Sequence, residues 1–82
     1  KKIVHLHIDS AYGREPLPAM RKICEDWGVE LIEISIPPPG LEQQSQWLQI
    51  RREDPDWVTF WGAGSGMNST AMTNAARAAS DV

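Results

Sequence analysis

Residues 3–18 read IVHLHIDSAYGREPLP, and they carry the pattern of a strand, a turn and the first turn of a helix. Apolar side chains alternate over residues 3–8, as they do in a β-strand with two different faces. A turn follows at residues 9–13. Pro16 and Pro18 suit the first turn of a helix, where a missing N–H costs little. One face of the strand carries Val4, Leu6 and Ile8, and the other carries Ile3, His5 and His7.

The first helix is predicted to continue to about Asp26, because apolar side chains recur along it every three or four residues. Gly28 supplies its C-terminal stop. We expect the apolar stripe to face the core, with Trp27 as a core residue. The stripe consists of Leu17, Met20, Ile23, Cys24 and Trp27.

A second strand and helix follow. Branched and apolar residues predict a strand over Val29–Ile36, and the prolines at 37–39 end it because proline cannot donate to a sheet. A helix is predicted over Leu41–Glu53, with a break at Asp54–Asp56. Its thinner apolar stripe consists of Leu41, Trp47, Leu48 and Ile50.

The last unit begins with a short, bulky strand at Trp57–Trp61. A glycine-rich loop at 62–66 comes next, and Asn68 or Ser69 is predicted to cap a third helix that is rich in alanine.

Strict alternation of strands and helices predicts an α/β fold, a three-layer βαβαβα unit with a parallel sheet. Right-handed crossovers favour strand order 2-1-3, with the first and second helices on opposite faces. The 82 residues suffice for one small domain. Because the chain opens directly in a strand, we expect residues 1–82 to be a single partial domain of a larger protein.

Composition excludes several classes of protein. The net charge is −3 and the eight Lys and Arg residues are dispersed, which argues against nucleic-acid binding. No apolar run reaches the roughly 18 residues of a membrane span. Cys24 is the only cysteine, so no disulfide can form within the chain.

A ligand site is predicted in the crevice between the first and third strands, since ligands of open α/β sheets bind beyond the carboxyl ends of the strands where strand order reverses. The loops at 9–14 and 62–68 border that crevice, and each leads into a helix N-terminus that favours an anionic group. Tyr12 offers a flat face and a hydroxyl, and Trp61 could form a wall. The predicted ligand-binding residues are Ser10, Tyr12, Gly13, Trp61, Gly62, Gly64 and Ser65. The alternative is that the glycines only turn the chain and Tyr12 only covers the helix start.

The order of these features resembles one lobe of a type I periplasmic binding protein. In that family an apolar strand leads into a Tyr-Gly pair and a long helix, as at residues 9–14. The likeness continues through residues 27–30, 50–51, 55–58 and 62–64, and it is nearest to the branched-chain amino-acid (Leu/Ile/Val) receptor branch. No single motif is specific, but the linear order covers nearly the whole chain.

The resemblance implies an extracytoplasmic, periplasmic or extracellular receptor of an ABC transporter, with two lobes that close on a small solute and then engage a membrane permease. The chain would be half of one lobe, without catalysis, cofactor or metal. Tyr12 matches an aromatic residue that some members place against the ligand. Residues 37–39 replace a loop in which some relatives place an acidic ligand contact, so the lobe lacks a matching acid for an α-amino group.

Other motifs are weaker. The glycines at 62, 64 and 66 are not spaced as a dinucleotide fingerprint, and the flanks of Ser65 lack the glycines of a nucleophile elbow. A metal site at His5, His7 and Cys24 would need further ligands, so we expect satisfied or partly exposed histidines.

Two other functions remain as alternatives: an enzyme or signalling domain of flavodoxin-like or Rossmann type, and a purely structural unit.

Exposed tryptophans and two open sheet edges predict that this piece alone would self-associate.

Overall fold

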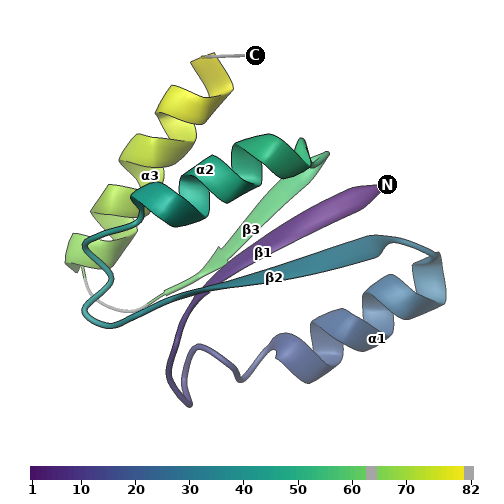
Figure 1. The fold of residues 1–82 in the computed structure, drawn as a ribbon. Coiled ribbons are helices and arrows are strands. Elements are labelled where there is room, and N and C mark those ends of the chain that lie inside the picture. Colours follow the sequence, from purple (N-terminus) through teal and green to yellow (C-terminus); the bar gives the residue numbers. More distant parts are fainter. Residues whose placement is uncertain (63–64, 81–82) are drawn as a thin grey trace.

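The computed structural model describes residues 1–62 and 65–80. Strands and helices alternate through them (Figure 1) in the order β1 (Lys2–Ile8), α1 (Leu17–Trp27), β2 (Glu30–Ile36), α2 (Gln44–Glu53), β3 (Trp57–Trp61) and α3 (Ser65–Ser80). Among these residues, no helix combines the length and the apolar character that crossing a bilayer requires.

The strands form one parallel sheet in the order β2-β1-β3. Leu6 of β1 lies opposite Ile34 of β2 and Phe60 of β3, so the middle strand is paired on both sides. The predicted fold class and strand order are therefore confirmed.

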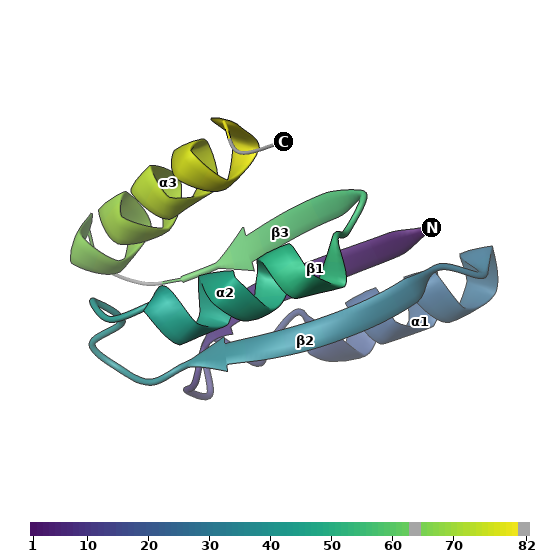
Figure 2. The same cartoon turned by 45° about the horizontal axis from the view of Figure 1, so that its top comes forward.

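The sheet lies between two helical layers (Figures 1 and 2), with α1 on one face and α2 and α3 on the other. The core fills the space between the sheet and the α2/α3 layer, which we call the packed face. Its buried side chains are Val4, Leu6, Ile8, Ile34, Ile36, Trp47, Ile50, Met67 and Ala71. Side chains two residues apart in a strand share a face, so the alternation in β1 directs one full set of apolar groups into this core.

A buried amide joins three elements at the edge of the packed face. Gln43 is 1% exposed, and its Nε2 donates to the carbonyl oxygens of Gly40 at 2.7 Å and Met67 at 3.1 Å. Its Oε1 accepts from the indole N–H of Trp47 at 3.0 Å. Each of these polar groups is satisfied where water cannot reach, so the loop after β2 is held against both α2 and α3.

The α1 layer covers the sheet more thinly, and the prediction that Trp27 lies in the core is wrong. Trp27 is 80% exposed and Ile23 is also exposed, whereas Leu17 and Cys24 are buried. Leu17 and Cys24 are seven residues apart and so point the same way, while Trp27 lies about 60° further round the helix from Cys24. The helix turns only its central line of residues toward the sheet.

The boundaries of two helices also differ from the prediction. Helix α2 begins at Gln44 rather than Leu41, and Leu41 and Leu48 are exposed, so its buried stripe is reduced to Trp47 and Ile50. Helix α3 begins at Ser65, ahead of the predicted caps Asn68 and Ser69. Because the helical position of Met67 buries its side chain in the core, packing outweighs the low helix propensity of Gly66.

Candidate functional site

The loop between β1 and α1 folds tightly back on the end of β1. The backbone N–H of Arg14 donates to the carbonyl of Ser10 at 3.0 Å, and the N–H of Gly13 donates to Ser10 Oγ at 3.1 Å. A Cβ on residue 13 would collide with the carbonyl oxygen of Ile8, so only glycine fits there without a backbone shift. Ser10 and Gly13 therefore shape the loop that presents Tyr12.

Tyr12 contacts Trp61 at the carboxyl ends of β1 and β3. The indole N–H of Trp61 donates to the backbone carbonyl of Tyr12 at 3.1 Å, and the two ring centroids lie 5.6 Å apart with their planes at 32°. Tilted aromatic pairs at this distance attract one another beyond the area that they bury. The loop after β1 is thus in direct contact with the last residue of β3, at the carboxyl ends of the two strands.

A cavity of about 290 Å³ opens beside this aromatic pair. It is lined by Tyr12, Phe60, Trp61, Gly62, Asn68 and Met72. At Gly62 a Cβ would come within 2.5 Å of the Phe60 ring and 3.0 Å of Met67 Sδ. Any larger residue at position 62 would therefore have to displace the Phe60 ring. Tyr12, Trp61 and Gly62 from the predicted set line the cavity.

The other predicted residues lie elsewhere. Ser10 and Gly13 are in the loop that supports Tyr12 and do not line the cavity. Ser65 is the first residue of α3, and Gly64 lies outside the described residues.

Sequence reasoning missed Phe60, Asn68 and Met72. Asn68 and Met72 are four residues apart and therefore share a face of α3. A predicted helix start at Ser65 would have placed both on that face.

Two charged residues of the loop that carries Tyr12 are paired with each other. Arg14 Nη1 lies 2.7 Å from Asp9 Oδ1, and both side chains are more than half exposed. Such an exposed pair contributes little to stability, but it supplies each charge with a partner.

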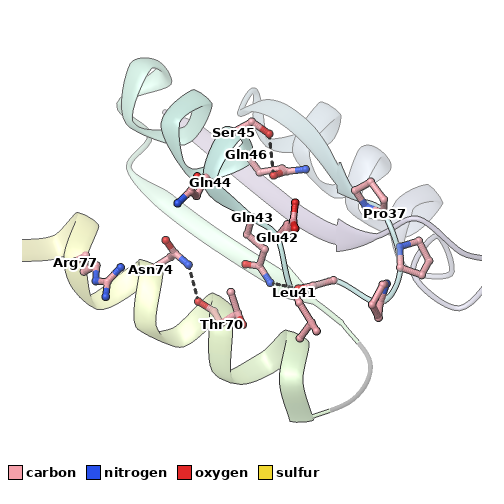
Figure 3. Close-up of a pocket in the computed structure, with 13 residues that line it drawn as sticks. Pro37, Leu41, Glu42, Gln43, Gln44, Ser45, Gln46, Thr70, Asn74 and Arg77 are labelled. Atoms are coloured by element: carbon pink, nitrogen blue, oxygen red, sulfur yellow. Dashed lines mark hydrogen bonds between the residues drawn. The ribbon is translucent and has the colours of Figure 1, made fainter.

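A second, open cavity of about 960 Å³ lies between the loop after β2, the start of α2 and one side of α3 (Figure 3). Pro37–Gln46 form one wall, and Thr70, Asn74 and Arg77 form the other. Asn74 Nδ2 donates to the carbonyl of Thr70 at 2.8 Å, so this amide is engaged within its own helix. The sequence did not predict this groove.

Two histidines lie between β1 and the α1 layer. The rings of His5 and His7 stack with centroids 5.7 Å apart, and His5 Nδ1 lies 2.8 Å from Thr59 Oγ1. Both are buried, and His5 Nε2 and His7 Nδ1 have no hydrogen-bond partner among the described residues, so the prediction of satisfied or partly exposed histidines is wrong. The described part of the chain contains no cluster of three side chains able to hold a metal ion.

Burial lowers the pKa of both histidines, because the charged imidazolium loses water there. The neighbouring charge of His7 lowers the pKa of His5 further, and Glu33 opposes both shifts. Arg21 binds Glu33 through two hydrogen bonds of 2.6 and 2.7 Å, and these bonds lower the pKa of the Glu33 carboxyl. With pKa values lowered from 6.5, His5 and His7 are both uncharged at neutral pH.

Comparison with known proteins gives no match to a family model and none to a curated protein. Two solved structures do match. One is named an ABC transporter permease from the Pseudomonas fluorescens group, with 45% identity over 95% of this chain and a TM-score of 0.87. The other is a fatty acid ABC transporter substrate-binding protein from Thermomonospora curvata, with 22% identity over 93% of this chain and a TM-score of 0.77.

This chain spans 19% and 20% of the two matched chains, about a fifth of their length. Over that fifth of its length, the first matched chain is similar to this chain in sequence as well as in fold. The second shows that the βαβαβα unit, with its parallel sheet in order 2-1-3, has the fold of part of a substrate-binding protein.

Proposed function

We propose that this chain forms part of the solute-binding wall in the substrate-binding component of an ABC transporter. The observation that carries the proposal is the contact between Tyr12 and Trp61 beside a cavity at the carboxyl ends of β1 and β3. Ligands of open α/β sheets bind at this position. The two structural matches support the same class of protein.

In this proposal residues 1–82 are half of one lobe of a two-lobe receptor, and the chain binds without catalysing a reaction. Tyr12, Trp61 and Gly62 contact the solute, while Ser10 and Gly13 hold the loop that carries Tyr12. Gly64 and Ser65, the latter being the first residue of α3, complete the proposed set. The solute is small, a branched-chain amino acid or a related compound.

The proposed partners follow from the same function. The complete protein is periplasmic or extracellular, and closure of its lobes on the solute presents a surface to the membrane permease. The dispersed charge of the chain supports a solute and a protein partner rather than a nucleic acid.

The test begins with a thermal-shift screen of the full natural protein against branched-chain amino acids, amides and aromatic acids. A solute that binds only the native state raises its melting temperature. No shift with any solute of such a panel would contradict the proposal.

With a bound solute in hand, Tyr12→Ala should weaken binding by about 1–3 kcal/mol in calorimetry, the usual cost of losing a packed aromatic anchor. Tyr12→Phe keeps the ring and should lose less. Glu25→Ala, on the exposed side of α1, is the control and should bind as the natural protein does. Unchanged affinity in Tyr12→Ala would remove Tyr12 from the site.

A further inference from the structure

The buried amide of Gln43 is bonded to the helix that forms one side of the cavity of about 290 Å³. Its Nε2 donates to the carbonyl oxygen of Met67 at 3.1 Å, 24 residues away in the chain. Met67 directly precedes Asn68, and Asn68 and Met72 are the residues of α3 that line this cavity. A side chain outside the cavity is therefore bonded to the backbone that carries part of its wall.

From this connection we propose that Gln43 is a positioning residue of the solute site, because its hydrogen bonds fix the first turn of α3 and with it Asn68 and Met72. The proposal rests on the proposed function and deepens it. Gln43 lines the larger groove (Figure 3) and not the smaller cavity, so it acts on the solute only through α3.

The loop after β2 passes unusually close to the start of α3. A Cβ on Gly40, whose φ is +83°, would come within 2.6 Å of Met67 Cγ. A Cβ on Gly66 would come within 2.7 Å of Leu41 Cδ2. Glycine at both positions makes this approach possible. Gln43 Nε2 also donates to the Gly40 carbonyl at 2.7 Å, so one amide group holds both sides of the contact.

Apolar packing alone does not fix the position of α3 as closely. Met67 and Ala71 are buried in the core, but apolar contact is non-directional and tolerates small shifts of a helix. A hydrogen bond weakens steeply when its angle departs from a straight line. Gln43 is 1% exposed, so a shift that broke its bonds would leave buried polar groups unpaired. The amide thus selects one position among those that the apolar contacts permit.

Met67 extends the effect of this amide to the end of β3. A Cβ on Gly62 would come within 3.0 Å of Met67 Sδ, and Gly62 is one of the residues that line the cavity. A displacement of Met67 therefore alters the cavity on two sides, at α3 and at the residue that follows β3.

The test measures solute affinity and stability separately in the full natural protein. The probe is whichever of leucine, isoleucine, valine, acetamide and phenylacetate raises the melting temperature most. Gln43→Met keeps a side chain of similar length but cannot donate to the carbonyls of Gly40 and Met67. Besides lowering the melting temperature, this change should weaken probe binding at least about fivefold in calorimetry, at a temperature at which the variant is fully folded.

Ile50→Ala is the matched control for lost stability. Ile50 is 3% exposed on α2 and lines neither cavity, so its truncation should lower the melting temperature at least as much. Its affinity for the probe should stay within about twofold of the natural value. Equal losses of affinity in Ile50→Ala and Gln43→Met would show that destabilisation alone weakens binding, and the proposal would be wrong.

A double-mutant cycle tests the route through α3. In a background that carries Asn68→Ala and Met72→Ala, α3 has lost the side chains that Gln43 positions, so Gln43→Met should weaken binding by less than about twofold more. In a Tyr12→Ala background those side chains remain, and the loss should again be at least about fivefold. An undiminished loss in the first background would overturn the route through α3.

If Gln43→Met does not fold, Gln43→Asn takes its place. This variant keeps an amide but is one methylene shorter, so it cannot span from the Gly40 carbonyl to that of Met67, and it should weaken binding at least about threefold.

The outcomes separate this proposal from the proposed function. If the natural protein binds the probe and the folded Gln43 variant binds it equally well, the proposal is wrong and the proposed function stands. If the natural protein binds no compound of the panel, the proposed function is contradicted and this proposal falls with it.

Discussion

The two faces of the sheet are built differently although the same three strands form them. On the packed face, α2 and α3 enclose Val4, Leu6 and Ile8 with branched side chains from β2. On the opposite face, which we call the open face, α1 buries only Leu17 and Cys24 of its own residues.

The open face instead carries polar and exposed groups. His5 and His7 are buried there, and each has one buried nitrogen without a hydrogen-bond partner in the part of the chain that the structure describes. Trp57 and Trp61 are exposed on β3. The comparison teaches that the two faces contribute unequally to stability, because buried polar atoms without partners on the open face cost free energy that the apolar core of the packed face must offset.

Truncation of a central side chain should have the largest effect. Leu6 is fully buried on the packed face, so Leu6→Ala in the full natural protein should reduce the free energy of unfolding by about 2–5 kcal/mol through lost transfer energy and the cavity left behind. Ile23→Ala, on the exposed side of α1, removes a similar group and should cost less than about 1 kcal/mol. Urea denaturation measures both. Similar losses would mean that the two layers pack equally well.

Acid should weaken the open face. Because the folded protein holds the pKa values of His5 and His7 below 6.5, the unfolded chain binds protons first as the pH falls. The contribution of these two histidines to stability is therefore complete above pH 6.5, falls as the pH drops from 6.5 through the lowered pKa values, and then levels off.

Denaturation midpoints between about pH 7.5 and 5 measure this effect. Glu33 changes the stability only below its ordinary pKa of 4.5. Because its folded pKa is lowered, its stabilisation is complete above that pH and is lost as the pH falls through the lower value. Replacing the histidine with a buried apolar group in His7→Leu should flatten the slope. An equal slope in this variant would show that other groups cause it.

The smallest effect on unfolding is expected at the exposed edge strand. Trp57 is 66% exposed on β3, so Trp57→Gln should change the free energy of unfolding by less than about 0.5 kcal/mol. The same change should reduce the self-association that we predict for a polypeptide of residues 1–82 alone, since it removes apolar surface beside an open strand edge. Sedimentation velocity measures the association. A strictly monomeric polypeptide at high concentration would contradict the prediction.

Part of the candidate site could be predicted from local pattern alone. Strand order 2-1-3 followed from the alternation of strands and helices, and it placed the loops of Tyr12 and Gly62 at one edge of the sheet. The sequence did not predict that Phe60 and Met72 line the cavity. A cavity is defined by distances between elements, and neither residue lies in a loop with turn chemistry.

The sequence by itself determined the order of elements, the parallel sheet and the two chemically different faces of β1. These depend on periods of two and 3.6 residues and on proline and glycine positions, which act within a few residues. Only the tertiary structure decided which apolar side chains are covered. Trp27 and Leu41 look like core residues in the sequence but are exposed, and Gln43 looks like a surface residue but is buried. Burial depends on where the neighbouring layer stands, and that position results from packing between segments far apart in the chain.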